Sequence, residues 1–185
     1  MPVWQPDARR VAFASNLGGE TGIWWMNADG SGERHPLLRA EYSLWPRGWR
    51  NRAIVYHELN PESGRDIWAV TGIGQDGDGS AEPVPVVRTP ANERAPALSP
   101  DGRWIAYVSD ESGRDEVYVQ AFEGDPARTT VSNDGGREPV WSRDGSELFY
   151  RVGDRMMTVP VQAGERFEAG TPELLFEGAF DADRM

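Results

Sequence analysis

Hydrophobic and polar residues alternate in short runs along the whole chain. Three such runs are GIWWMN (22–27), DIWAVT (66–71) and EVYVQAF (116–122), and a fourth, RMMTVPV (155–161), follows the same pattern. A period of two residues is typical of a β-strand with one buried face, and the Gly, Asp and Pro residues between the runs favour turns. No stretch shows the 3.6-residue periodicity of a helix over a sufficient length. The pattern therefore predicts an all-β protein.

The runs belong to a longer repeat. The segments 2–13 (PVWQPDARRVAF), 96–107 (PALSPDGRWIAY) and 139–150 (PVWSRDGSELFY) carry a proline, a hydrophobic residue, a turn aspartate and a final aromatic residue at equal offsets. The connector ESGRD also occurs twice, at 62–66 and 111–115, each time just before an alternating run. Such regularity indicates that one structural unit is repeated.

The repeat divides the chain into four units of four strands, at approximately 2–40, 41–90, 91–134 and 135–178. The aromatic residue that ends the second strand of each unit recurs at intervals of 43, 51 and 43 residues. These aromatic residues are Phe13, Tyr56, Tyr107 and Tyr150. Units of about 40 to 50 residues with four strands each are typical of propeller blades.

The motifs of the last two units resemble those of a known family. IAYVSD (105–110), GRDEVYV (113–119) and WSRDG (141–145) resemble the WD40-like PD40 repeat of TolB-type β-propellers. The similarity is weakest in the second unit, where Trp45 and Trp49 both fit the inner strand and leave its register open. The last two units are also similar to propeller regions fused to bacterial serine/threonine protein kinases. The resemblance implies a β-propeller of four-stranded antiparallel blades.

The number of blades raises the question of how the propeller closes. Propellers of this family usually have six to eight blades, whereas the sequence holds four. Because blades pack face to face, an open arc of four would leave two large apolar flanks in water, and exposed faces of that size favour association. We therefore expect a homodimer that closes an eight-bladed ring, since closed cyclic pairs are the commonest oligomers. A four-bladed ring within one chain is the alternative.

The composition narrows the class of partner. Thirty acidic side chains against 19 basic ones give a net charge of −11, which disfavours binding to nucleic acid or to a membrane surface of anionic lipid. The chain has no cysteine, which excludes disulfides and thiolate metal sites. It has no apolar stretch long enough for a signal peptide or a membrane span, so the sequence as it stands predicts a cytoplasmic protein, although relatives of this type are often exported.

The candidate ligand-binding residues are the polar residues that begin the inner strands. In a propeller these strand ends surround the axial channel, where ligands and metals usually bind; they are Glu41, Asn92, Glu93, Arg94, Arg137 and Glu138. Carboxylates from several strands could hold Ca²⁺ or Mg²⁺, which could activate water. Glu93 and Glu138 are therefore the candidate metal ligands and catalytic residues. The competing interpretation is a solvated salt network in which they pair with Arg94 and Arg137.

His57 is a further catalytic candidate, because it follows the aromatic residue of the second unit and a histidine can act as a general base. His35 lies in an outer strand and is expected at the surface. No nucleophile elbow G-x-S-x-G, phosphate-binding loop or zinc-ligand spacing accompanies either histidine.

Other repeated residues have structural explanations. Asp7, Asp101 and Asp144 occupy the first turn of their units, where an aspartate accepts backbone N–H groups and caps the turn. Equivalent aromatic and aliphatic positions are expected to pack between blades. These positions are Trp24, Trp68 and Tyr118 on third strands, and Trp4, Leu98 and Trp141 on inner strands.

The sequence supports three functions. The first is a binding or scaffold module that recognises a protein, a peptide or a small molecule at the mouth of the axial channel. The second is a metal-assisted hydrolase of phosphotriesters, esters or lactones. The third is a fragment of a larger kinase-linked sensor. Fold alone does not choose among them.

Overall fold

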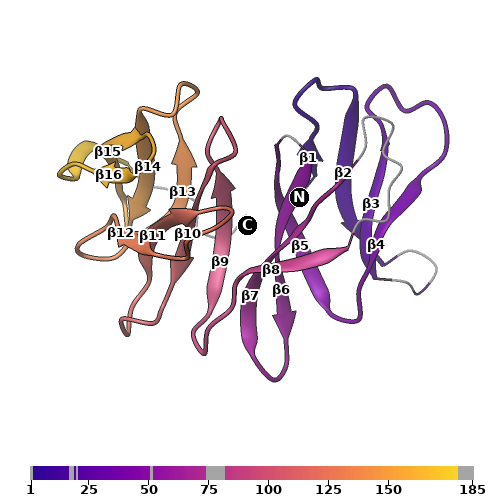
Figure 1. Ribbon diagram of the computed structural model, residues 1–185, viewed down its shortest axis with the longest axis horizontal. Helices are drawn as coiled ribbons and strands as arrows, with labels where there is room; N and C mark the ends of the chain where they lie inside the picture. Colours follow the sequence, from indigo (N-terminus) through magenta and orange to yellow (C-terminus); the bar gives the residue numbers. More distant parts are fainter. Residues whose placement is uncertain (1, 17–18, 20, 51, 74–81, 179–185) are drawn as a thin grey trace. The chain divides into compact units, whose positions relative to one another are not determined.

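The computed structural model of the chain describes residues 2–16, 19, 21–50, 52–73 and 82–178. It divides into two compact units, Met1–Leu98 and Ser99–Met185, and each unit is described by itself. The regular elements of the described residues are β-strands in four antiparallel sheets, which confirms the all-β class (Figure 1).

The first two sheets lie in the first unit and have the orders β1-β2-β3-β4 and β5-β6-β7-β8. Each strand pairs with the next one along the chain, as in a propeller blade. The strands of the first sheet are β1 (Val3–Trp4), β2 (Arg10–Ser15), β3 (Gly22–Asn27) and β4 (His35–Arg39). Those of the second are β5 (Ser43–Arg50), β6 (Ala53–Asn60), β7 (Gly64–Val70) and β8 (Pro83–Val87).

The other two sheets have the orders β12-β11-β10-β9 and β13-β14-β15-β16, and β17 also pairs with β15. Their bounds are β9 (Glu93–Leu98), β10 (Trp104–Ser109), β11 (Glu116–Ala121) and β12 (Arg128–Thr130), then β13 (Arg137–Trp141), β14 (Glu147–Val152), β15 (Arg155–Ala163), β16 (Phe167–Ala169) and β17 (Glu173–Glu177). The fourth sheet therefore has one strand more than the four that the sequence pattern predicts.

The additional strand, β16, helps to attach the fourth sheet to the third. The long strand β15 pairs with β17 through its first half and with β16 through its last three residues. Phe167 of β16 lies 5.5 Å from the ring of Trp104 and 6.1 Å from that of Trp141. The guanidinium of Arg103 donates to the carbonyl oxygens of Ala163 and Gly164 at 2.8 and 3.2 Å. These contacts make β16 part of the packing between two sheets of the second unit.

The hydrophobic core of the first unit lies between its two sheets. Val3 and Ile23 of the first sheet form one buried cluster with Leu44, Trp49 and Ile54 of the second. Strand β5 contacts β1, β2 and β3, so the second sheet covers one face of the first.

The register of the second sheet is settled by burial. Trp49 is 1% exposed and lies in the core cluster, whereas Trp45 is half-buried and stacks on His57 with 5.0 Å between ring centroids. A bulge between Pro46 and Gly48 lets both side chains take these positions on one strand.

The expected packing of the inner-strand residues is wrong for Trp4. Leu98 and Trp141 are 7% and 9% exposed, but the equivalent Trp4 is 53% exposed. The reason is its place in the fold: Trp4 lies on the face of the first sheet that is opposite to the core residue Val3, and the second sheet covers only the face of Val3.

Candidate functional site

A charged groove lies in the second unit where three connections meet. They are the segment between β12 and β13, the β10–β11 connection and the β14–β15 turn. The groove has a volume of about 530 Å³. Its lining residues are Arg114, Asp115, Asp134, Gly135, Gly136, Arg137, Arg151, Val152, Gly153 and Asp154.

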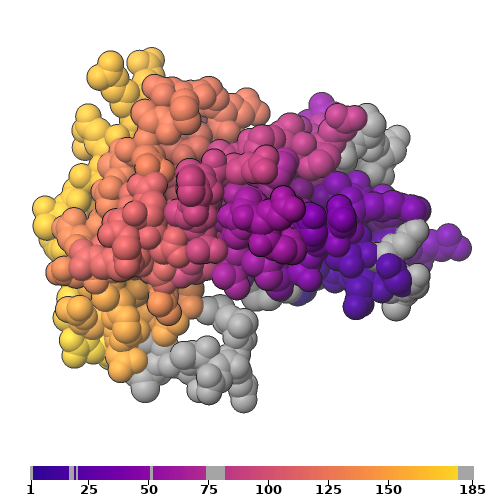
Figure 2. Space-filling model, turned by 90° about the horizontal axis from the view of Figure 1, so that it is seen from below, coloured from indigo at the N-terminus to yellow at the C-terminus, as the bar shows by residue number. Residues whose placement is uncertain are grey.

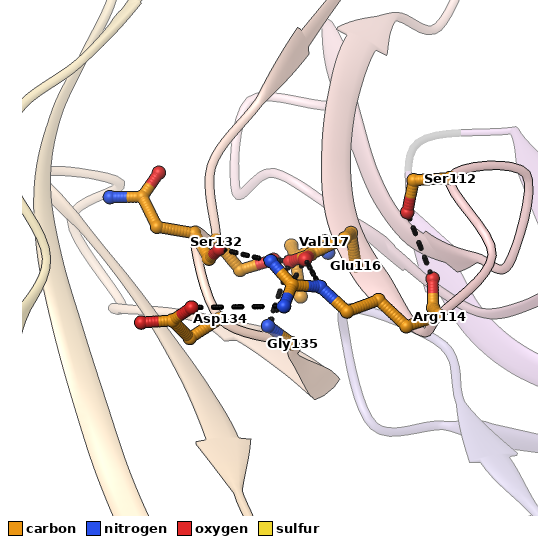
Figure 3. A network of polar contacts seen from close by, with 8 residues as sticks. Ser112, Arg114, Glu116, Val117, Ser132, Asp134 and Gly135 are labelled. Carbon is orange, nitrogen blue, oxygen red and sulfur yellow. Dashed lines mark hydrogen bonds and ion pairs between the residues drawn. The ribbon is translucent and has the colours of Figure 1, made fainter.

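Glu116, the first residue of β11, holds the segment between β12 and β13 against the sheet (Figure 3). Its carboxylate is 4% exposed and accepts hydrogen bonds from the Arg114 Nε at 2.5 Å, from the Gly135 amide at 3.1 Å and from the Ser132 hydroxyl. The Ser132 Oγ in turn accepts the amide of Val117 at 2.7 Å. A buried carboxylate with this many donors holds its connection in one conformation.

Arg114 extends this network toward the groove. Its guanidinium donates to the carbonyl oxygen of Asn133 and lies 3.7 Å from the carboxylate of Asp134. Its own carbonyl oxygen accepts the hydroxyl of Ser112 at 3.1 Å. As Figure 3 shows, one arginine thus connects the β10–β11 segment to the segment that enters β13.

Two glycines bring the connection close to β11. Gly135 has a φ of 94°, a conformation that favours glycine. A Cβ atom on Gly136 would lie 2.8 Å from the Val117 Cγ2 and 2.9 Å from the Ser132 Cβ, and its amide donates to the Asp115 carbonyl at 2.8 Å. Gly136 therefore has no room for a side chain next to Val117 and Ser132.

Ion pairs form the walls of the groove. Arg137 lies 2.6 Å from the carboxylate of Asp115; the arginine side chain is 64% exposed and the aspartate 14%. Arg151 donates two hydrogen bonds to Glu138, at 3.0 and 2.9 Å. This hydrogen bonding to Glu138 raises the pKa of the Arg151 guanidinium. Glu138 has a φ of 57° beside a bulge in β13, which turns its side chain toward β14.

The predicted site residues fall into two groups. Arg137 lines the groove of the second unit, and Glu138 lies next to it; Glu41, Asn92, Glu93 and Arg94 belong to the first unit. The solvated salt network is wrong for Glu93, because this side chain is fully buried and accepts the Thr89 hydroxyl at 2.5 Å. Glu138 does form an ion pair with an arginine, but this arginine is Arg151, while Arg137 forms an ion pair with Asp115.

The other first-unit residues have different surroundings. The Asn92 Oδ1 accepts the Arg65 amide at 3.4 Å, while Glu41 is exposed and Arg94 half-buried. Glu41 contributes to a raised pKa of Glu58, after burial and the charge of Asp66.

His57 is 5% exposed, and its Nδ1 has no hydrogen-bond partner among the described residues. Burial lowers its pKa to about 3, and the charges of Arg47, Arg65 and Arg94 act in the same direction. His57 is thus a neutral, buried side chain stacked on Trp45. His35 is exposed and stacks on Trp25.

The turn aspartates share one geometry. The Oδ1 atoms of Asp7, Asp101 and Asp144 each accept the amide two residues further on, at 3.0, 3.1 and 3.1 Å. Asp144 also accepts the hydroxyls of Ser142 and Ser146, and these bonds lower its pKa to about 2.

Two buried carboxylates at the ends of the ESGRD connectors were not predicted from the sequence. Glu116 follows the second connector, and Asp66, the last residue of the first, is 2% exposed and accepts the Ser63 hydroxyl at 2.6 Å. The signal was present, because a carboxylate stands directly before a buried Ile or Val in both blades, as the last residue of the first connector and as the residue after the second. Alternation alone assigns that position to a loop, where a charged residue needs no explanation.

Comparisons with known proteins show which proteins the chain resembles. Over 118 residues, 64% of this chain and 25% of the relative, the chain is 30% identical to a TolB homologue of Chlorobium luteolum. The structure of a putative TolB from Agrobacterium tumefaciens matches 94% of this chain and 63% of that one, with a TM-score of 0.71 and 18% identity. An oligogalacturonate lyase from Vibrio parahaemolyticus matches 99% and 55%, with a TM-score of 0.67 and 12% identity.

These similarities cover only part of the length of the related proteins. The chain spans about a quarter of the length of the Chlorobium relative, and no protein-family model matches it. At 18% and 12% identity the two structures show a shared fold. Among the described residues, no helix is long and apolar enough to cross a bilayer, and no three His, Cys, Asp or Glu side chains are grouped to hold a metal ion.

Proposed function

The chain is built of TolB-type β-propeller blades, and from this premise we propose that it is a binding module that recognises a peptide segment of a protein partner in the groove of its second unit. The observation that carries the proposal is a groove of about 530 Å³ with ion pairs as its walls and with a β12–β13 segment that is held by hydrogen bonds within the protein. A site that is already ordered loses little conformational entropy when a ligand binds.

The charges of the groove indicate what kind of segment fits. The side chains of Arg137 and Arg114 are 64% and 55% exposed, and that of Asp134 is 88% exposed. Guanidinium groups bind carboxylates through paired hydrogen bonds, and an exposed aspartate attracts lysine or arginine. A segment that carries both acidic and basic side chains therefore matches the groove better than one of a single charge.

Fluorescence anisotropy with three labelled octapeptides tests this proposal. The probes are octaglutamate, octalysine and an alternating Glu–Lys peptide, and we expect the alternating peptide to bind best. Arg137→Gln should weaken its binding about fivefold to tenfold, because one charge-assisted hydrogen bond contributes about 1 to 1.5 kcal/mol.

Arg143→Gln is the matched control, because Arg143 is exposed and does not line the groove. Equal binding by the two variants, or no binding of any probe at millimolar concentration, would reject the groove as the site. The position of the groove at the mouth of an axial channel stays a prediction.

A metal-assisted hydrolase stays the alternative prediction from the sequence. It requires Ca²⁺ or Mg²⁺ near Glu93 or Glu138, two carboxylates that bind Thr89 and Arg151 in this structure. Elemental analysis together with phosphotriesterase, esterase and lactonase assays tests it. The prediction requires activity that a chelator removes and that Glu93→Gln or Glu138→Gln lowers; activity at the buffer rate would end it.

Association is the remaining part of the proposal. We keep the homodimer, closed as an eight-bladed ring, as the expected state, with the four-bladed monomer as its alternative. The exposed Trp4 supports association, because a neighbouring sheet would cover it as it covers Leu98 and Trp141. The link to a protein kinase stays a prediction.

A further inference from the structure

One position of the repeat differs in exposure between blades. Val87 of β8 and Val131, the residue after β12, pair with equivalent residues of their third strands and are 5% and 2% exposed. Phe176 of β17 pairs with Met156 in the same way, yet it is 49% exposed. The yellow segment that contains β17 lies at the surface in Figure 2. The fourth sheet is therefore uncovered where the second and third sheets are covered.

The inner strands show the same difference. Val3 and Val140 each follow a proline at equivalent places in β1 and β13. Val3 is 7% exposed because β5 of the next sheet packs on β1, whereas Val140 is 58% exposed. The strand register places three further side chains on the face of Val140. We call this face the fourth flank: Val140, Phe149, Met156 and Phe176.

The first sheet is also uncovered, but on the face opposite to Val3, the residue equivalent to Val140. Trp4 is 53% exposed, and the register of β1, β2 and β3 places Phe13, Trp24 and Met26 on the same face. Phe13 is half-buried, whereas the equivalent Tyr150 is 2% exposed. A groove of about 510 Å³ runs along Trp24 and Met26. We call this face the first flank: Trp4, Phe13, Trp24 and Met26.

We propose that the first flank of one copy packs on the fourth flank of a second copy, in a head-to-tail contact. The contact continues one that the molecule already contains. In the first unit, the face of Val3 and Ile23 packs on the following sheet, and the fourth flank is the equivalent face of the last sheet. The first flank is, in turn, the equivalent of the face that Leu98 and Trp141 bury against a preceding sheet. Each flank thus presents apolar side chains on a face that an adjacent sheet covers elsewhere in the molecule.

The area of the flanks agrees with a stable pair. Four strands spaced about 4.8 Å apart and about six residues long cover roughly 400 Å². A pair that uses both flanks of each copy would bury about 800 Å² per copy, which is the size of a standard specific interface. A heterologous contact forms either a closed ring or an open chain of copies, and the homodimer proposed above requires that two such contacts close the ring.

Light scattering across a range of protein concentrations is the first test, and it rests on the homodimer proposed above. We expect the wild-type protein to have the mass of two 20.6 kDa chains. Trp4→Asp and Phe176→Asp should each lower the association constant at least a hundredfold, because an unpaired charge is then buried in both contacts. Leu59→Asp is the control: Leu59 is 38% exposed and lies on neither flank.

A mixing experiment separates the head-to-tail contact from other dimers. A mixture of Trp4→Asp and Phe176→Asp proteins contains one pair of unaltered flanks, so we expect dimers to reappear in the mixture and in neither variant alone. Dimers in the mixture also show that both variants are folded. If near-ultraviolet circular dichroism shows an unfolded variant, Trp4→Gln and Phe176→Gln replace the pair.

The outcomes are distinct. A monomeric wild-type protein would overturn both the homodimer and the flank contact. A dimer that neither flank variant weakens, or variants that fail to recover on mixing, would overturn the flank contact alone. Binding of the alternating Glu–Lys peptide, measured on the same samples, reports separately on the groove.

Discussion

At the scale of single residues, His57 shows how burial changes the role that a side chain can play. Its position after an aromatic strand end made it a candidate general base, but such a base needs a pKa near the working pH. The structure buries His57 beside Trp45, and its pKa of about 3 keeps the imidazole neutral. The residues next to His57 in the sequence show neither how deeply it is buried nor which arginines lie near it.

This burial predicts how stability depends on pH. In the unfolded chain His57 has a pKa of about 6.5 and is protonated below that pH. In the folded protein its pKa is about 3, so it stays neutral until the pH falls that far. The free energy of unfolding therefore falls as the pH falls from 6.5, and above 6.5 this residue has no effect. Between pH 7.5 and 4.5 we expect His57 to contribute a loss of about 2 to 3 kcal/mol.

Urea unfolding at the two pH values measures the effect. His57→Phe keeps the stack on Trp45 and removes the titrating group, so its loss should be smaller than that of the wild-type protein by this amount. His35→Phe, at the exposed histidine, is the matched control. Identical losses for both variants would show that His57 is protonated in the folded state.

At the scale of elements, the alternating pattern determines where strands occur but not how closely they approach. Gly22 begins β3 as an ordinary residue of the run GIWWMN, yet a Cβ atom there would lie 2.1 Å from the carbonyl oxygen of Leu38 in β4. The last two strands of the first blade can pair only because this residue has no side chain.

Gly22→Ala should therefore destabilise the protein by about 2 to 3 kcal/mol, because the backbone of β4 has to move. Gly178→Ala is the matched control, since a Cβ atom at that position meets nothing within 4 Å. Urea denaturation of the two variants measures the difference. Equal midpoints would mean that β4 adapts without cost.

Because alternation does not show which strands and side chains touch, two features were not predicted from the sequence. The segment of β16 is too short to show alternation, and its place beside β15 depends on contacts of Phe167 with Trp104 and Trp141. Glu116 likewise reads as the polar end of a loop, and only its donors Arg114, Ser132 and Gly135 reveal it as a buried anchor.

At the scale of the whole molecule, the net charge and the two flanks act in opposite directions. A charge of −11 keeps copies apart at long range, whereas the flanks favour contact at short range. Salt should therefore strengthen the proposed pairing, because it screens the repulsion and leaves the apolar contact intact.

Pairing also has a thermal consequence. Since a partner that binds only the folded state stabilises it, the melting temperature should rise with protein concentration. Calorimetry over a hundredfold range of concentration measures this rise, and Phe176→Asp should abolish it. A melting temperature that stays constant in the wild-type protein would contradict pairing at those concentrations.

The all-β class, the four repeats and the resemblance of the blades to TolB could be predicted from the amino-acid sequence, because a two-residue period and a recurring turn are visible in neighbouring residues. Arg137 and Glu138 were also predicted from the sequence as site residues, because they begin an inner strand. The fold was needed to find their ion-pair partners, the burial of Glu93 and His57, and the exposure of Trp4 and Phe176. Burial and ion pairing depend on residues that are far apart in the chain, and a repeat is the same sequence pattern whether or not a neighbouring blade covers it.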